Sequence, residues 1–293
     1  MNPTLDSLDK IKIGTCAWSY EDWRGAFYPE HLPAAERLAF YAHHFNSVEV
    51  DSTFYAAPAA KTALHWFETT PPDFVFSCKM PREITHERRL RDCAEPLDHF
   101  LRSLRPLGEK LGCILVQLPP SFRPRRDELA LRAFVRGLPS HLRFAVEFRH
   151  HDWHLPRIVH LLAESRVCWA WTDATPFDHK DEGAFEFLPQ AADFIYLRLL
   201  GDFDAKYGED GERLHTYRER LWPRDAPVEN WATRLRQRIA EVSNIFAYSA
   251  NHFEGFAPAT ARRLAALLDL PARALPKQAS AEADANRGQI ELL

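Results

Sequence analysis

The chain has 293 residues, of which 46% are hydrophobic and 27% charged, with a formal net charge of −4 at pH 7. This is an ordinary globular composition with enough apolar material for a core, which excludes a fibrous or wholly disordered chain. The small negative charge gives no overall attraction to nucleic acids or anionic membranes. No apolar run approaches the roughly 18 residues of a membrane-spanning helix.

The five cysteines are widely spaced and form no CxxC pair. This pattern is typical of reduced thiols in a reducing compartment. The first ten residues are polar and lack the apolar segment of a signal peptide. We therefore expect a cytoplasmic protein that is not embedded in a membrane.

Eight short, apolar, β-rich runs alternate with segments of helical length. The expected strands are 11–15, 47–51, 74–79, 113–118, 144–148, 167–172, 194–199 and 245–248. The expected helices are 34–45, 59–68, 96–111, 127–138, 155–164, 228–242 and 257–268. Apolar strands separated by helices predict a parallel sheet covered on both faces. Eight such units predict an α/β fold consisting of one (β/α)8 barrel of the TIM type.

The connections between these units are uneven. Residues 173–193 contain two prolines and a glycine and have room only for a short or degenerate sixth helix. The connection 80–94 is rich in Arg and His, and the long loop 201–227 after the seventh strand is expected to be a lid over the barrel mouth. We expect an N-terminal tail, a single barrel domain and a flexible C-terminal tail, at 1–10, 11–270 and 271–293.

An open doubly wound sheet is the alternative architecture. Such folds commonly place a GxGxxG or GxxxxGK[ST] loop after a strand to cradle phosphate. No strand of this chain is followed by either loop. The barrel is therefore favoured.

Charged and amide side chains stand at the carboxyl end of nearly every expected strand, where a TIM barrel carries its active site. Because side chains alternate along a strand, Glu49 and Asp51 share the inward face of one strand, and Glu147 and Arg149 share that of another. The other strand-end residues are Lys79, Gln117, Asp173, Arg198 and Asn251. Inward charges are costly unless they are paired, so this ring predicts a binding site.

The catalytic groups expected in this ring are Glu49, Glu147 and Asp173. Acid–base chemistry needs carboxyls in unlike environments. Glu49, flanked by Asp51, should titrate high, whereas Glu147 beside Arg149 should stay ionised. The alternative is that the ring charges only neutralise one another, for example Glu147 with Arg149 or Lys79 with Glu49.

Two further segments allow two interpretations each. The aromatic segment 18–29 either stacks on a sugar or base or plugs one side of the barrel top. Arg82, His86, Arg88 and Arg89 form either an anion-binding rim or an exposed basic loop.

A divalent metal is a less favoured alternative, and no cofactor is predicted. Glu49, Glu147 and Asp173 offer oxygen ligands, but no histidines stand at HxH or HExxH spacing. Lys79 and Arg198 in the same mouth would also compete with a cation.

Distinctive motifs are spread over residues 13–268. They are GTCAWSY at 14–20, WRG at 23–25, FYP at 27–29, VEVDSTFY at 48–55, TH at 85–86, LG at 111–112, QLPP at 117–120, AVEFRH at 145–150 and YLR at 196–198, with Lys79, Trp153 and Asp173. In these motifs the chain resembles the DUF72 (YecE-like) family of uncharacterised proteins. The resemblance implies a TIM barrel but no agreed activity.

The residues expected to bind the ligand combine the strand-end ring with the family motifs. They are Trp18, Asp51, Tyr55, Lys79, His86, Gln117, Arg149, Arg198 and Asn251.

The chain departs from the family pattern at four positions. Ala17 replaces a glycine, Asp51 an asparagine, Leu200 a histidine and Ala250 one of two consecutive asparagines. Losing the histidine and the asparagine removes a proton carrier and an amide from the mouth. This predicts altered specificity or weakened chemistry.

Three functions agree with these features. The first is a hydrolase or lyase acting on a phosphorylated, sugar-like or nucleotide ligand, whose anionic group Lys79, Arg149 and Arg198 would hold. The second is a metal-dependent nucleic-acid phosphodiesterase, against which the overall acidity counts. The third is a non-catalytic sensor or adaptor for a small anion, closed by residues 201–227.

Overall fold

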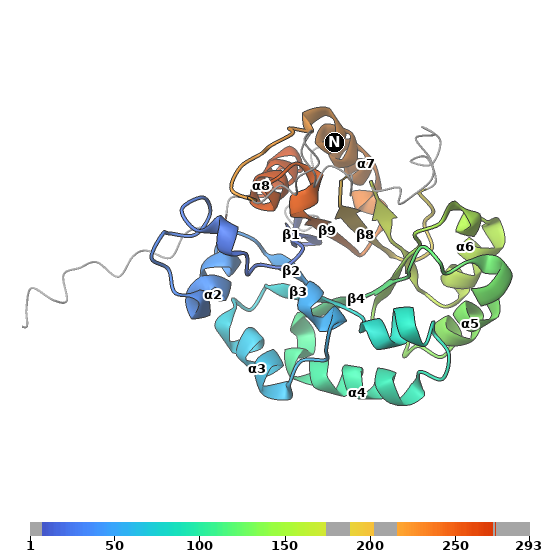
Figure 1. Ribbon diagram of the computed structural model, residues 1–293. Helices are drawn as coiled ribbons and strands as arrows, with labels where there is room; N and C mark the ends of the chain where they lie inside the picture. Colours follow the sequence, from blue (N-terminus) through green and yellow to red (C-terminus); the bar gives the residue numbers. More distant parts are fainter. Residues whose placement is uncertain (1–7, 174–187, 202–215, 272, 274–293) are drawn as a thin grey trace, which may run out of the picture.

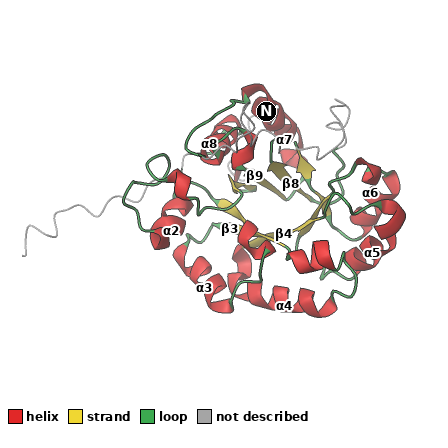
Figure 2. Cartoon of the chain, in the orientation of Figure 1, coloured by secondary structure: helices red, strands yellow, loops and turns green. Residues whose placement is uncertain are grey.

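The structure, a computed structural model, describes residues 8–173, 188–201, 216–271 and 273 (Figure 1). Its strands lie in the centre and its helices form an outer ring around them (Figure 2). The strands are β1 (Ile11–Thr15), β2 (Ser47–Val50), β3 (Val75–Lys79), β4 (Leu111–Gln117), β5 (Phe144–Glu147), β6 (Cys168–Trp169), β7 (Trp171–Thr172), β8 (Phe194–Leu199) and β9 (Asn244–Ser249). The α-helices are α2 (Arg37–Ala42), α3 (Ala60–Thr69), α4 (Ala94–Leu104), α5 (Pro124–Arg136), α6 (Pro156–Glu164), α7 (Asp225–Arg238) and α8 (Ala257–Leu267).

Two parallel sheets, ordered β1-β9-β8-β7 and β2-β3-β4-β5-β6, meet at two seams. At the first seam, β6 and β7 are halves of one strand interrupted at Ala170, whose N–H donates to the Val146 carbonyl at 2.9 Å. At the second, Cys16 forms a parallel bridge with Glu49, and the Ala17 N–H donates to the Glu49 carbonyl at 2.7 Å. The eight expected strands therefore close into a TIM-type barrel, and the open doubly wound sheet is wrong.

Most element bounds agree with the sequence-based prediction within about two residues, and the differences have local causes. The helix expected at 96–111 ends at Leu104 and continues as a 3₁₀ segment, η5 (Arg105–Lys110). Pro106 removes a backbone donor there, and Gly108 has φ 49°, which a helix does not allow. The helix expected at 228–242 begins earlier, at Asp225, and passes into the 3₁₀ segment η9 (Ile239–Glu241).

Several expected features lie outside the described residues. They are most of the degenerate sixth helix, most of the expected lid, and the greater part of both tails. The domain bounds at 11 and 270 stay a prediction. No helix among the described residues is long and apolar enough to cross a membrane.

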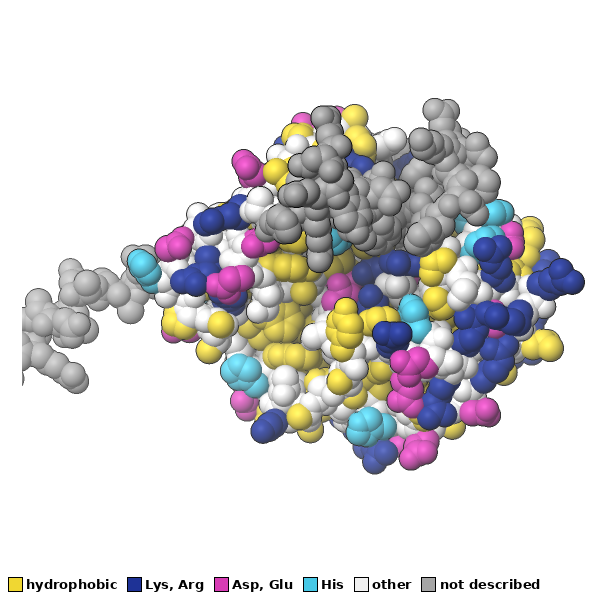
Figure 3. Space-filling view, viewed as in Figure 1, with side chains coloured by type: hydrophobic (Ala, Val, Ile, Leu, Met, Phe, Trp, Pro, Cys, Tyr) yellow, Lys and Arg dark blue, Asp and Glu magenta, His cyan; other side chains and the backbone are white. Residues whose placement is uncertain are grey.

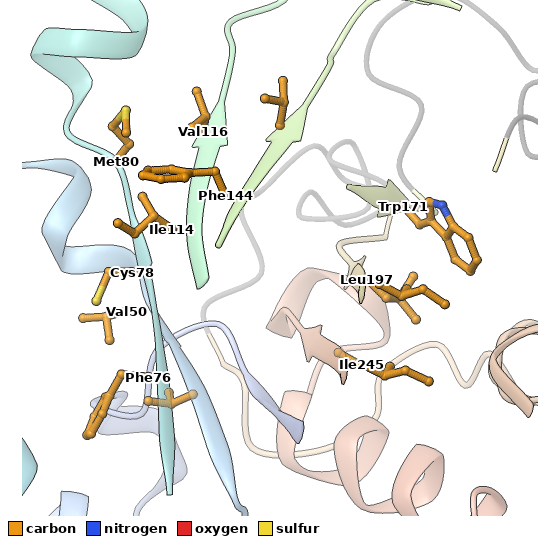
Figure 4. Close-up of a cluster of buried hydrophobic side chains, with 14 of the residues drawn as sticks. Val50, Phe76, Cys78, Met80, Ile114, Val116, Phe144, Trp171, Leu197 and Ile245 are labelled. Atoms are coloured by element: carbon orange, nitrogen blue, oxygen red, sulfur yellow. The ribbon is translucent and has the colours of Figure 1, made fainter. Parts of the chain in front are cut away.

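Alternation along the strands divides the apolar core into two layers. Outward-facing side chains such as Val50, Phe76, Ile114 and Leu197 belong to a large cluster shared with the helices (Figure 4). Inward-facing side chains such as Leu115 belong to a second cluster that fills the barrel. Burying a large apolar side chain contributes roughly 1.5–3 kcal/mol, so these two layers supply the main stabilisation.

All five cysteines are free thiols, and all are buried. Burial raises the pKa of Cys93 to about 11 and that of Cys168 to about 12. Burial likewise raises the pKa values of the other three thiols, Cys16, Cys78 and Cys113. They stay protonated near neutral pH and are poor nucleophiles.

The seam between β1 and β2 predicts the effect of Gly14→Ala. A Cβ at position 14 would lie 1.9 Å from the Ser47 carbonyl oxygen and 2.8 Å from the Tyr41 hydroxyl, so one strand must shift. We expect the free energy of unfolding, measured by urea denaturation, to fall by about 2 kcal/mol or more.

Gly137→Ala is the matched control. Its Cβ would meet its nearest atoms at an ordinary 3.5 Å, and φ is −86°. We expect a change within about 1 kcal/mol. Equal losses in the two variants would contradict the close approach of the strands at position 14.

Candidate functional site

A buried ion-pair network lies inside the carboxyl end of the barrel. Arg198 on β8 reaches Glu49 on β2, with Nη2 2.6 Å from Oε1 and Nε 2.9 Å from Oε2. The Tyr196 hydroxyl, also on β8, donates to Oε2 at 2.6 Å. The charged side chains of this pair are almost completely shielded from solvent. Donors hold both oxygens of Glu49, as burial of a carboxylate requires.

The same guanidinium binds a second carboxylate. Arg198 Nη1 donates to Glu147 Oε2 on β5 at 2.5 Å and to Gln117 Oε1 on β4 at 3.3 Å. Arg149 Nε donates to the other oxygen of Glu147 at 2.7 Å. The structure thus brings together five members of the predicted ring, namely Glu49, Gln117, Glu147, Arg149 and Arg198.

The two buried carboxyls have pKa values shifted in opposite directions. Burial raises the pKa of Glu49, and the charge of Asp51 adds to the rise while Arg198 opposes it. Burial acts on Glu147 too, but Arg198 and Arg149 outweigh it and bring its pKa down to about 2. Both directions agree with the sequence-based expectation. The main cause for Glu49, however, is burial rather than its neighbour Asp51.

A cavity of about 330 Å³ opens at the mouth above this network. Strand ends contribute Asp51, Lys79 and Gln117 to its lining, and loops contribute Phe54, Tyr55, Arg82 and His86. Asp51 and Gln117 join the cavity to the network, since Asp51 Oδ1 lies 3.7 Å from Arg198 Nη2 and Gln117 accepts from Nη1. Acidic and basic side chains lie next to each other near the centre of the face in Figure 3.

Lys79 pairs with Asp51 instead of with Glu49. Its Nζ lies 3.5 Å from Asp51 Oδ1, and the two side chains are 13% and 30% exposed. Glu49 does not pair with Lys79 because Arg198 and Tyr196 already occupy both its oxygens. The Lys79–Asp51 pair is longer and more exposed to solvent than the ion pairs of the network beneath it, so its contribution to stability is small.

The Asp51 side chain is positioned by a short 3₁₀ segment, η3 (Asp51–Phe54), that starts where β2 ends. The strand expected to include Asp51 therefore ends one residue earlier. Thr53 Oγ1 donates to the carbonyls of Val50 and Lys79, at 2.7 Å each. This hydroxyl ties η3 to the end of β3.

His86 lines the cavity as a neutral group at neutral pH. Burial lowers its pKa to about 4, and the positive charges of Lys79 and Arg149 add to this effect. Its Nδ1 lies 2.9 Å from the Thr85 hydroxyl. It therefore offers hydrogen bonds to a ligand rather than a charge.

The arginines of the expected anion-binding rim separate into two groups. Arg82 lines the cavity. Arg88 pairs with Glu83, and Arg89 Nη2 lies 2.6 Å from the buried carboxylate of Asp127 on α5. Arg88 and Arg89 thus tie the loop down, which the sequence alone did not reveal.

Asp173 lies apart from the network. Its Oδ1 accepts the Leu200 N–H at 2.5 Å, and its Oδ2 accepts the Gly201 N–H at 3.1 Å. Arg224 Nη1 lies 3.8 Å from Oδ2. The carboxylate holds the turn after β8, where Gly201 has φ 72°.

The aromatic segment 18–29 packs as a plug. The fully buried Trp23 donates through Nε1 to Asn251 Oδ1 at 3.2 Å, and the same oxygen accepts the Ala257 N–H at 3.0 Å. The Tyr28 hydroxyl donates to the Trp18 carbonyl. Trp18 and Asn251 are absent from the described lining of the mouth cavity.

The departures from the family pattern have identifiable surroundings. Leu200 and Ala250 belong to the same buried cluster as Cys16. Ala17 has φ 66°, in the left-handed region that glycine adopts without strain. A glycine suits that backbone better, and the alanine carries a local cost.

The carboxylates expected to form a metal site do not converge, because Asp173 faces the turn after β8. Cys16, Glu49 and Asp51 do place ligand atoms within 4.8 Å of one another. Arg198 lies 2.6 Å from Glu49, and burial raises the pKa of the Cys16 thiol. Both features disfavour a cation there. A second group, past β5, consists of His150, His151 and Asp152.

Two residues of the site were missed by sequence reasoning. Tyr196 precedes Arg198 by two positions, so the two side chains point to the same inward face of the strand. Alternation along the strand could therefore have identified Tyr196. Phe54 is the last residue of η3, and the Lys79 ammonium lies over its ring, 4.4 Å from the centroid. No periodicity marks that position.

The fold and this network define a TIM-type barrel with a charged carboxyl-terminal mouth. The chain belongs to the family described as "Protein of unknown function DUF72", which it matches over residues 12–285. The sequence motifs had pointed to this family, and the match confirms it.

Two curated relatives are similar to the chain. UPF0759 protein YecE of Escherichia coli (strain K12) is 38% identical over 140 residues, or 48% of each chain, so the chain spans about half the length of that relative. UPF0759 protein YunF of Bacillus subtilis (strain 168) is 24% identical over 271 residues, covering 89% of this chain and 95% of the relative.

Two solved structures share the fold. The DUF72 family protein TM1631 from Thermotoga maritima has a TM-score of 0.71 and 26% identity, covering 88% of this chain and 99% of that one. The DUF72 family protein EF0366 from Enterococcus faecalis has a TM-score of 0.70 and 20% identity, covering 92% and 99%.

The buried network predicts that Arg198→Met strongly lowers the stability of the fold. The substitution leaves Glu49 and Glu147 buried without their shared cation, and breaking a buried pair costs about 3–5 kcal/mol. We expect a loss of that size in the free energy of unfolding, measured by urea denaturation.

Arg102→Met is the control, because Arg102 pairs with Asp98 on α4 while the two side chains are 56% and 61% exposed. We expect a change of about 0.5 kcal/mol or less there. Similar small changes in both variants would mean that Arg198 does not hold the carboxylates.

The surroundings of Asp173 predict a pH dependence of stability. Burial raises its pKa from 3.8 to about 6, although two N–H groups oppose the rise. The folded state then binds more protons than the unfolded state between about pH 4 and 6, so this carboxyl lowers stability as pH rises through that range. We expect Asp173→Asn to remove this part of the slope of unfolding free energy against pH.

Asp98→Asn, at an exposed carboxylate, is the control for removing one carboxyl from the chain. If the slopes of wild type and Asp173→Asn coincide between pH 4 and 6, the Asp173 carboxyl does not titrate there.

Proposed function

We propose that the protein is an enzyme of the hydrolase or lyase class that binds a small anionic ligand in the mouth cavity. The observation that carries this proposal is the joint placement of Lys79 and Arg82 in one cavity whose floor groups, Asp51 and Gln117, contact Arg198. Anion holders and a carboxylate thus face the same space. Active sites of TIM barrels lie at this end of the strands.

The charges of the cavity favour an anion. Lys79 and Arg82 bring two positive charges and Asp51 one negative charge, while His86 is neutral because its pKa is about 4. Among the described residues, Lys79 contacts the Asp51 carboxylate at 3.5 Å and the Phe54 ring at 4.4 Å, and Arg82 pairs with the exposed Glu87 at 3.4 Å. The Arg82–Glu87 pair is solvent-exposed, and exposed pairs contribute about 0–1 kcal/mol, so an anionic ligand can replace Glu87 at little cost.

The buried network supports the cavity electrostatically. Glu147, with a pKa of about 2, stays ionised and keeps Arg149 and Arg198 in place. Asp51 is the carboxylate that reaches the ligand, and Glu49 is a positioning residue that acts through Arg198. Groups fixed before the ligand arrives need no reorganisation during the reaction.

The proposal predicts the effect of Lys79→Met on ligand binding. Removing this charge should weaken binding of phosphorylated metabolites by about tenfold or more, because a charge-assisted hydrogen bond to phosphate is lost. Isothermal titration of a panel of phosphorylated and unphosphorylated metabolites measures this. Lys61→Met, at an exposed lysine on α3, is the matched control and should leave affinity unchanged.

The same panel separates an enzyme from a sensor. Compounds that bind are followed for turnover, and Asp51→Asn should slow turnover more than it weakens binding. Binding without turnover in wild type would indicate an anion sensor. If Lys79→Met and Lys61→Met bind every compound as wild type does, the cavity is not the anion site.

A further inference from the structure

One aromatic ring at the mouth is unusually exposed. Tyr55 is 81% exposed, and it is the aromatic residue among the three exposed large apolar side chains of the described residues. It lines the same cavity as Lys79 and Arg82. A large apolar side chain in water loses the free energy that burial would provide. An aromatic ring exposed beside a charged cavity can regain that free energy by covering a ligand.

The Tyr55 ring packs against Phe54, which contacts other residues of the cavity. Its edge contact with Phe54 has a centroid distance of 5.4 Å and an interplanar angle of 81°. Phe54 in turn contacts the Lys79 ammonium at 4.4 Å and the His86 ring at 5.0 Å. Thr53 anchors this segment to the Lys79 carbonyl. Phe54 thus links the Tyr55 ring to the cation at position 79, and all three side chains line the same cavity.

We infer that the ligand of the mouth cavity is a mononucleotide, whose base stacks on Tyr55 while its phosphate binds Lys79 and Arg82. This inference rests on the proposed function, since it needs an anion site in the same cavity. Every base has a π-face that an exposed aromatic ring can cover. Asp51 can accept hydrogen bonds from ribose hydroxyls, and Gln117 offers both a donor and an acceptor.

The size of the cavity limits the ligand to one nucleotide unit. Ligand cavities in proteins range over roughly 300–1,000 Å³, and this one, at about 330 Å³, is near the lower end. Among the described residues that line it, Lys79 and Arg82 carry positive charge, which suits one phosphate group. An oligonucleotide would need a longer cationic track.

The test compares ligands that differ in one part. Isothermal titration is carried out with the 5′-monophosphates of adenosine, guanosine, cytidine and uridine, with ribose 5-phosphate and with adenosine. Wild type is expected to bind at least one monophosphate on the order of tenfold more tightly than ribose 5-phosphate, the gain expected of one aromatic stack. Tyr55→Ala should abolish that difference and leave ribose 5-phosphate affinity unchanged, whereas Tyr55→Phe should retain it.

Leu129→Ala is the matched control, because Leu129 on α5 is equally exposed at 82% and lies outside the mouth cavity. It should change none of these affinities. Circular dichroism of each variant confirms that the surface substitution leaves the fold intact.

The possible failures are distinguishable. If ribose 5-phosphate binds in a Lys79-dependent manner but Tyr55→Ala changes nothing, the nucleotide inference falls and the proposed anion site stands. If Tyr55→Ala weakens ribose 5-phosphate and monophosphates equally, the ring covers a sugar instead of a base, and the inference is again wrong. If no phosphorylated compound binds, both proposals fall.

Discussion

The guanidinium of Arg198 sits in the closed interior of the barrel, where a charge without partners costs several kcal/mol. Its partners come from β2, β4 and β5, while Arg198 itself comes from β8. Four strands must therefore hold their registers for these atoms to meet. The positions of Glu49, Gln117 and Glu147 at the barrel mouth are therefore coupled through this one cation.

This constraint divides the polar residues of the mouth into two tiers. The buried tier, centred on Glu49 and Glu147, has its hydrogen bonds satisfied internally and cannot easily exchange partners. The upper tier, with Lys79 and Asp51, is partly exposed and loosely paired. Under the proposed function, a ligand would exchange partners in the upper tier, while the lower tier would keep the geometry fixed. Such preorganisation is what a site needs in order to act on transition-state charge.

The eight strands and the inward direction of Glu49, Glu147 and Arg198 could be predicted from the sequence, because the alternation of side chains follows directly from strand geometry. Pairing was less predictable. Lys79 pairs with Asp51 because Arg198 already binds Glu49. The spacing of residues along the sequence does not show which side chains meet across the barrel. Asp173 follows its strand by one residue, where alternation no longer governs direction, and Tyr55 owes its exposure to a 3₁₀ turn without a periodic signal.

The buried thiols have a practical consequence for work on the molecule. Thiolates are the nucleophiles that attack alkylating reagents and maleimide dyes, and all five native thiols are buried with raised pKa values. A cysteine introduced at an exposed position, such as 129 on α5, would therefore be the one fast-reacting thiol of the folded protein. Fluorescent or spin labels can then be attached to the native sequence background, without first removing cysteines that fill the barrel and its surrounding core.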